Sequence, residues 1–134
     1  MEIRKVSEQF SVSGQLVPEA LPELKAAGVR TLICNRPDHE APDQPEHALI
    51  EQRARELGME VHYLPVVHDT ISAQNVEDFA ALLKAASYPV HAWCRSGLRS
   101  ITLWSLAQIK AGADPTAQVA TASRLGFDFR SFLD

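Results

Sequence analysis

The stretch PVHAWCRSGLRS, residues 89–100, decides the fold of this chain. Its apolar first part, Pro89 to Trp93, predicts a buried β-strand. The polar part that follows, Cys94 to Ser100, contains one glycine and predicts a tight loop, after which a long helix is expected over Ile101 to Ala111. A strand that leads through a short loop into a helix is the repeating unit of α/β proteins with a parallel sheet.

The same alternation of strands and helices continues on both sides of this stretch. It implies one α/β domain over residues 1–134, with a mostly parallel sheet flanked by helices. In such sheets the functional loops follow the carboxyl ends of the strands, so the loops after Cys34, Val67 and Trp93 are expected on one rim. The further strands are expected over Phe10–Gly14, Val29–Cys34 and Met59–Val67, and the further helices over Glu19–Ala27, Glu46–Leu57, Ser72–Ala86 and Thr116–Leu125.

Composition and charge exclude several classes of function. With 13 basic and 17 acidic residues the net charge is −4, which argues against a nucleic-acid partner. No apolar run approaches the roughly 18 residues that span a bilayer, and the N-terminus lacks the features of a signal peptide, so we expect no membrane partner and a cytoplasmic location. Two cysteines without any zinc-binding spacing predict neither a disulfide framework nor a metal or other cofactor.

The loop from Cys94 to Ser100 carries the chemistry. Its amide groups can point inward, and the start of the following helix adds partial positive charge, so the loop can bind an anion. Gly97 allows the positive φ angle that such a ring needs, and the planar fork of Arg99 suits an oxyanion. Ser100 can donate a hydrogen bond to the sulfur or cap the following helix. The remaining residues of this anion-binding loop are Arg95, Ser96 and Leu98.

The positive electrostatic potential of the loop amides and of the helix start is expected to lower the pKa of Cys94. We therefore expect Cys94 to be a thiolate at neutral pH and a nucleophile for phosphorus or activated sulfur. The plainer alternative is a buried cysteine at the end of a strand, with solvated arginines near it. Cys34 also ends a strand on the expected rim. It can serve as a resolving thiol for Cys94 or pack in the core, and packing is the favoured interpretation.

The motif C-R-S-G-x-R-S, from Cys94 to Ser100, resembles the active loop of small rhodaneses and of protein tyrosine phosphatase-like proteins. The wider pattern is similar to the phosphatase-like domain of beta-lactamase hydrolase-like proteins, a bacterial family also described as sulfur transferases. This resemblance implies a dual-specificity-phosphatase-like α/β fold over about the whole chain. The other matching segments are Ser11–Gln15, Asn35–Asp38, Pro42–Pro45 and Leu103-Trp104.

Two positions depart from the pattern of this family. Trp93 stands where family members usually have a histidine, and Leu98 stands where threonine is common. Rhodaneses, in contrast, commonly carry an aromatic residue before the cysteine. We expect His91 to lie on the opposite face of the strand from Trp93 or to be shifted away from it, so it is not taken as a substitute for the missing histidine.

Loop length favours sulfur transfer. Four residues separate Cys94 from Arg99, one fewer than in protein tyrosine phosphatases, and the shorter ring resembles the rhodanese arrangement for the outer sulfur of a persulfide. In this reaction Cys94 takes sulfur from a small anionic substrate, thiosulfate or glutathione persulfide. Arg99 and the loop amides stabilise the Cys94 persulfide, and a thiol acceptor then removes the sulfur.

Hydrolysis of a phosphoester through a Cys94 phosphocysteine is the alternative, and it needs an acid for the leaving group. Asp69 is the first candidate, because its placement resembles the general-acid loop of dual-specificity phosphatases, although a simple turn residue is the plainer interpretation. Asp38 is the second candidate. Asn35, Arg36 and Asp38 are also expected to support the site, with Arg36 and Asp38 as a pair that holds the loop.

A third possibility is a non-catalytic module whose loop senses an anion or a persulfide and signals to a partner. Separately, fused relatives of the resembled family imply that the chain works beside a persulfide dioxygenase or a lactamase-like metallo-hydrolase. The sequence leaves the oligomeric state open.

Overall fold

A five-stranded sheet forms the centre of the computed structural model, which describes residues 2–133 apart from the side chain of Asp69. The strand order is β1-β2-β5-β3-β4. Strands β2, β5, β3 and β4 run parallel, and β1 joins one edge antiparallel to β2. The mostly parallel α/β sheet expected from the sequence is therefore confirmed. The strands are β1 Arg4–Ser7, β2 Phe10–Ser13, β3 Thr31–Cys34, β4 Glu60–Tyr63 and β5 Val90–Trp93.

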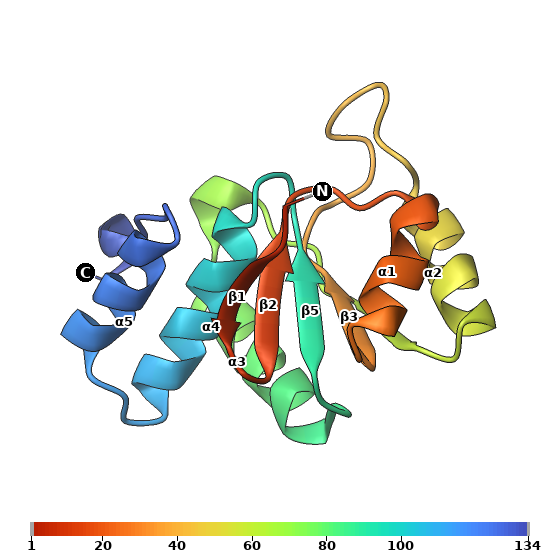
Figure 1. The fold of residues 1–134 in the computed structure, drawn as a ribbon. Helices are drawn as coiled ribbons and strands as arrows, with labels where there is room; N and C mark the ends of the chain where they lie inside the picture. Colours follow the sequence, from red (N-terminus) through yellow and green to blue (C-terminus); the bar gives the residue numbers. More distant parts are fainter. Residues whose placement is uncertain (1, 134) are drawn as a thin grey trace.

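Helices cover both faces of this sheet (Figure 1). Helices α1 and α2 lie on one face, while α3 and α4 lie on the other, with α5 packed against α4. Within residues 2–133, none of these helices combines the length and the apolar character needed to cross a membrane. The helices are α1 Leu21–Ala26, α2 His47–Glu56, α3 Ala73–Ala85, α4 Leu98–Lys110 and α5 Pro115–Arg124, and the short 3-10 turns are η1 Pro18–Ala20, η2 His68–Thr70 and η3 Arg130–Phe132.

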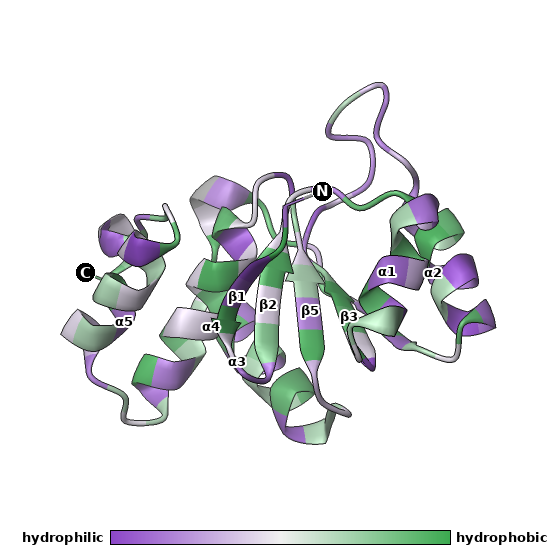
Figure 2. Cartoon of the chain, viewed as in Figure 1, coloured by the Kyte–Doolittle hydropathy of each residue, from purple (hydrophilic) through white to green (hydrophobic). Residues whose placement is uncertain are grey.

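Each face of the sheet has its own apolar core. Phe79 and Phe129 are fully buried in the cluster under α3 and α4, and Trp93 is fully buried with Leu21 and Ile50 under α1 and α2. Figure 2 shows hydrophobic residues along the strands and a largely hydrophilic loop between β3 and α2. Because Trp93 is fixed in a core and Cys94 follows it directly, the start of the Cys94–Ser100 loop is rigidly anchored.

Most of the expected boundaries hold to within two residues, and the structure differs from the expectation mainly at three points. The sequence pattern does not indicate β1, because Arg4–Ser7 alternates between half-buried and exposed residues at the edge of the sheet. The strand expected over Met59–Val67 is limited to β4. Helix α4 begins at Leu98 rather than at Ile101, because Gly97 in a left-handed conformation turns the chain directly into the helix.

Candidate active site

The loops that follow β3, β4 and β5 meet at one end of the sheet. Val66 lies in the loop after β4, and its carbonyl accepts a hydrogen bond of 2.9 Å from Arg99 Nη1. Asn35 follows β3 directly, and its Oδ1 accepts a hydrogen bond of 2.9 Å from the hydroxyl of Ser100. The first turn of α4 is therefore held by both neighbouring loops, and the three loops share the rim that the parallel topology predicts.

Cys94 lies at the base of this rim and is only 1% exposed. The backbone N–H of Gly97 donates a hydrogen bond to Cys94 Sγ at 3.1 Å. Gly97 has a φ of 103°, and a Cβ at this position would lie only 3.0 Å from Cζ of Phe127, so both the backbone conformation and the space favour glycine here. A backbone N–H aimed at the sulfur stabilises a negative charge there, which suits a cysteine nucleophile.

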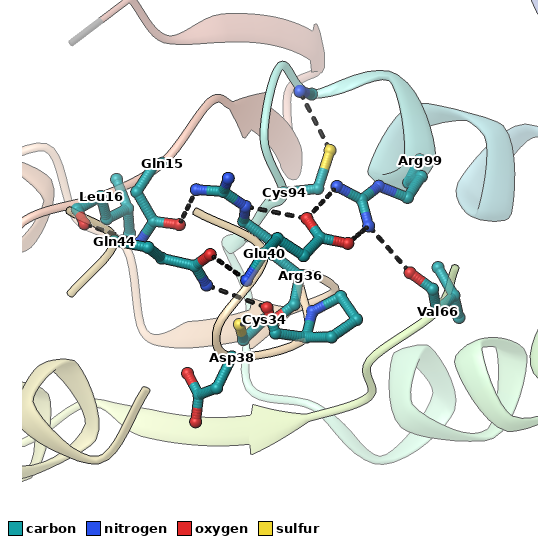
Figure 3. A network of polar contacts seen from close by, with 12 residues as sticks. Gln15, Leu16, Cys34, Arg36, Asp38, Glu40, Gln44, Val66, Cys94 and Arg99 are labelled. Atoms are coloured by element: carbon teal, nitrogen blue, oxygen red, sulfur yellow. Dashed lines mark hydrogen bonds and ion pairs between the residues drawn. The ribbon is translucent and has the colours of Figure 1, made fainter. Parts of the chain in front are cut away.

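Arg99 lies in the first turn of α4, is 5% exposed and forms a bidentate ion pair with Glu40 (Figure 3). Its Nη1 and Nη2 donate to Oε2 and Oε1 of Glu40, each at 2.8 Å. These hydrogen bonds are the main reason why the pKa of Arg99 lies above its ordinary value, although burial acts in the opposite direction. Arg99 is thus a permanent cation in a fixed orientation.

Glu40 is a site residue that the sequence did not indicate. Its Oε1 also accepts from Arg36 Nε at 3.0 Å, so the carboxylate lies between two guanidinium groups (Figure 3). The hydrogen bond from Arg99, and to a smaller extent that from Arg36, lowers the pKa of Glu40 to about 2, although burial raises it. Glu40 is therefore ionised at neutral pH and has no proton to give to a leaving group.

The predicted pair between Arg36 and Asp38 is wrong. Arg36 donates to Glu40 and, through Nη1, to Oε1 of Gln15 at 3.0 Å. Asp38 Oδ1 instead accepts from the backbone N–H of His47 at 2.8 Å, at the start of α2. A carboxylate is favoured there, because the first amide groups of a helix lack partners and carry partial positive charge. This structural use of Asp38 argues against its role as the general acid.

The expected role of Ser100 is also wrong in detail. Its hydroxyl donates to Asn35 Oδ1, and neither to the sulfur nor to the start of the helix. Asn35 Nδ2 in turn donates to the carbonyl of Leu64 at 2.9 Å. Because Ser100 and Asn35 are fully buried, these hydrogen bonds tie α4 to β3 and to the loop after β4.

His91 lies on the same face of β5 as Trp93, contrary to our expectation, because side chains two residues apart in a strand point to the same side. Its Nδ1 and Nε2 lie 2.7 Å and 2.8 Å from the hydroxyls of Ser11 and Ser13. Since Ser13 donates its own proton to the carbonyl of Gly14, its hydroxyl accepts from Nε2–H, and Nδ1 accepts from Ser11. Burial lowers the pKa of His91 to about 3, so the ring is neutral.

The two serines beside His91 belong to the strand that supports the Cys94–Ser100 loop. The backbone N–H of Cys94 donates to the carbonyl of Ser13 at 3.3 Å. Next to it, a Cβ at Gly14 would lie 2.8 Å from the carbonyl oxygen of Arg95, so the two backbones can approach only because this residue is glycine. The buried His91 network thus fixes the end of β2 against the loop.

Cys34 is packed rather than reactive. It is 2% exposed, and its Sγ donates to the carbonyl of Arg36 at 3.3 Å. Burial raises the pKa of Cys34 to about 12, which keeps it a neutral thiol at physiological pH. Both Cys34 and Cys94 are free thiols. These features favour the packing interpretation over a resolving role.

A shallow pocket of about 480 Å³ opens over the Cys94–Ser100 loop. Arg95 and Ser96 are exposed at this pocket, and Arg95 makes no ion pair or side-chain hydrogen bond with the described residues. The side chain of Asp69 lies outside the described part of the chain, and its backbone belongs to η2 beside the pocket. Its role as an acid stays a prediction. The pocket is lined by Glu40, Val67, His68, Arg95, Ser96, Leu98 and Arg99.

The sequence of this chain is similar to that of a known family. The model of the family described as "Beta-lactamase hydrolase-like protein, phosphatase-like domain" matches residues 2–111. A beta-lactamase hydrolase-like protein from Agrobacterium fabrum is 30% identical over 129 residues, which cover 96% of this chain. The chain spans about 30% of the length of this relative.

Solved structures with the same fold are described as phosphatases. A structure described as a candidate phosphatase from Neisseria meningitidis has a TM-score of 0.88 and 34% sequence identity, and the match covers 98% of this chain and 94% of that one. The core catalytic domain of a PP-IP phosphatase from S. cerevisiae shares the fold, with a TM-score of 0.72, 14% identity and coverage of 92% and 74%. The chain thus has the phosphatase-like α/β fold.

Proposed function

The chain belongs to the phosphatase-like domain family of beta-lactamase hydrolase-like proteins, and from this premise we propose that it hydrolyses a small phosphate monoester through a Cys94 phosphocysteine. The observation that carries the proposal is the Cys94–Ser100 loop, in which the Gly97 N–H points at the nucleophilic sulfur and Arg99 is fixed beside it. The shallow pocket over the loop leaves room for a substrate that presents its anionic group at the surface.

In the first step the Cys94 thiolate attacks phosphorus, so that an S–P bond forms while the bond to the leaving oxygen breaks. Arg99 and the loop amides hold the phosphoryl oxygens, on which negative charge is spread in the transition state. An acid must protonate the leaving alkoxide, and Asp69 is our candidate, since Glu40 is ionised and Asp38 holds α2. Water then attacks phosphorus, breaks the S–P bond, and releases phosphate and the thiolate.

Sulfur transfer is the second candidate, and the spacing of the loop favours it. Four residues lie between Cys94 and Arg99, which makes a ring smaller than that of protein tyrosine phosphatases. In this reaction the Cys94 thiolate attacks the outer sulfur of thiosulfate, an S–S bond forms, and sulfite leaves with the electron pair of the broken bond. Sulfite needs no proton to leave, so no acid at the position of Asp69 is required.

The mass of the covalent intermediate distinguishes the two reactions. The reduced protein is mixed with p-nitrophenyl phosphate or with thiosulfate, quenched in acid, and measured intact by mass spectrometry. The proposal predicts the gain of one phosphoryl group and steady release of phosphate. A gain of one sulfur atom that a thiol reductant removes, without any phosphoryl gain, would replace it by sulfur transfer. A modification that forms without catalytic turnover would indicate a sensor.

Two cysteine variants make this experiment specific. Cys94→Ser removes the nucleophile and is expected to abolish both the covalent gain and turnover. Cys34→Ala removes the packed thiol and is expected to keep both, because Cys34 is a neutral buried group. Turnover that survives in Cys94→Ser contradicts every reaction considered for this site.

A further inference from the structure

The guanidinium group of Arg99 uses only part of its hydrogen-bonding capacity within the protein. Of its five N–H groups, three have partners: two on Nη1 donate to Glu40 and to the Val66 carbonyl, and one on Nη2 donates to Glu40. The Nε–H and the second Nη2–H make no hydrogen bond to an oxygen or nitrogen of the described residues. These two groups point in the same direction along one edge of the planar fork.

Cys94 lies within reach of this guanidinium group. After the hydrogen bonds to Glu40, the nearby Cys94 sulfur is a further cause that raises the pKa of Arg99. Glu40 occupies only the outer edge of Arg99, formed by Nη1 and Nη2 (Figure 3). Apart from the Cys94 side chain, which interacts with Arg99, no described residue engages the edge formed by Nε and Nη2. This edge can therefore serve as a two-point donor for the oxyanion of a substrate that reacts at Cys94.

We propose that Glu40 is a positioning residue, which holds Arg99 so that its Nε–Nη2 edge faces the anion bound at Cys94. This inference rests on the proposed site, and it applies equally to a phosphoryl group and to thiosulfate. In this arrangement Glu40 acts through Arg99, although it also lines the pocket. A flexible arginine gains affinity for an anion when another group fixes its orientation beforehand, because less conformational entropy is lost on binding.

Arg36 completes the arrangement by balancing the charge of Glu40. Its Nε donates to Glu40 at 3.0 Å, while its Nη1 is held by Gln15 at 3.0 Å. Two guanidinium groups and one carboxylate leave one net positive charge, so Glu40 can orient Arg99 without cancelling the attraction for an anion. Arg36 is 5% exposed, which places it behind the site rather than at the entrance.

The test compares two alkylating reagents of similar size, the anion iodoacetate and the neutral iodoacetamide. In both reactions the Cys94 sulfur forms a bond to carbon and displaces iodide, and the rate at Cys94 is followed by peptide mass spectrometry. Neither reagent requires phosphatase or sulfurtransferase turnover, so the result is independent of which proposed reaction is correct. The ratio of the iodoacetate rate to the iodoacetamide rate measures how strongly Arg99 favours an anionic reagent over a neutral one at Cys94.

Glu40→Gln makes the site more positive by one charge and keeps the size of the side chain. If Glu40 positions Arg99, the rate ratio falls by about tenfold, as for the loss of one charge-assisted hydrogen bond. If Glu40 only reduces the positive charge or competes with anions, the ratio rises, and the proposal is overturned. Glu46→Gln is the matched control, because this exposed residue of the same loop carries the same charge, and its one ion pair among the described residues is with His39, at 3.9 Å.

A second measurement separates positioning from a general loosening of the loop. Inorganic phosphate should protect Cys94 from iodoacetamide, and Glu40→Gln should weaken this protection by about tenfold. In an Arg99→Ala background the same substitution should have no further effect, because Glu40 acts through Arg99. An equal loss of protection in both backgrounds would show that Glu40 acts by another route and would refute the proposal.

Discussion

Glu40 and Arg99 lie 59 residues apart in the chain and are joined by two hydrogen bonds of 2.8 Å. Glu40 belongs to the long loop between β3 and α2, and Arg99 belongs to the first turn of α4. The orientation of Arg99, the arginine that we propose binds the anion, therefore depends on a loop for which the sequence predicts no secondary structure. Because the contact is bidentate and charged and involves the buried side chain of Arg99, it also contributes to the stability of the fold.

The contribution of Glu40 to stability should depend on pH. Because the folded pKa of about 2 lies below the ordinary value of 4.5, its contribution is present above about pH 4.5 and is lost as the pH falls towards 2. At pH 7, Glu40→Gln should lower the free energy of unfolding by about 1–3 kcal/mol. Urea denaturation of both proteins should show that this difference shrinks between pH 4.5 and pH 2.5. A difference that stays constant over this range would exclude the ion pair as its cause.

Gly97→Ala should cost more stability than Gly112→Ala, although both glycines have positive φ angles, 103° and 111°. The left-handed conformation alone costs an alanine about 1–2 kcal/mol. A Cβ at Gly97 also meets Phe127 at 3.0 Å, whereas nothing lies within 4 Å of one at Gly112. Thermal unfolding of both variants measures the difference. Gly97→Ala should also slow the alkylation of Cys94, because it displaces the N–H that faces the sulfur; Gly112→Ala should not.

His91 should make the protein less stable as the pH falls below about 6.5. The unfolded chain binds a proton at this histidine near pH 6.5, but the folded chain does so only at about pH 3. Protonation of His91 therefore does not lower the free energy of unfolding above pH 6.5. Below this value it lowers that free energy by up to about 1.4 kcal/mol per pH unit. His91→Gln should remove this slope between pH 7 and pH 5 in urea denaturation, whereas the exposed His68→Gln should keep it. An unchanged slope in His91→Gln would contradict a neutral buried ring.

The elements around the Cys94–Ser100 loop could be predicted because their signals are local. An apolar run predicts β5, and a single glycine between a cysteine and an arginine predicts the tight turn. The edge strand Arg4–Ser7 is half-exposed and paired on one side only, so its alternation carries little signal. The prediction that His91 lies on the opposite face from Trp93 is wrong for a different reason. The two-residue period of a strand already places the two side chains on the same face.

The polar partners of the site could not be predicted from the sequence. Arg36 and Asp38 are close in the chain, which makes a local pair plausible. In the structure, however, Arg36 turns to Glu40 and Gln15, while Asp38 turns to the start of α2. Which carboxylate reaches which arginine depends on the path of the loop between β3 and α2, and this path is set by contacts between segments far apart in the chain.

Arg95 should contribute to the binding of anions at the pocket, but less than Arg99. It is exposed and makes no ion pair with the described residues, so its guanidinium group attracts an anion through solvent. Arg95→Ala should lower the affinity for inorganic phosphate by about two- to fivefold at low salt, corresponding to the roughly 0.5–1 kcal/mol of an exposed charge pair, and the effect should fade at high salt.

The affinity is measured by protection of Cys94 from iodoacetamide at two ionic strengths. Arg124→Ala is the control, because it removes the same charge from the last turn of α5, away from the residues that line the pocket. An equal loss of phosphate affinity in Arg95→Ala and Arg124→Ala would mean that the affinity depends only on the net charge of the protein and not on the position of Arg95. A salt-independent loss of tenfold or more would instead place Arg95 in direct contact with the bound anion, as a second arginine of the site.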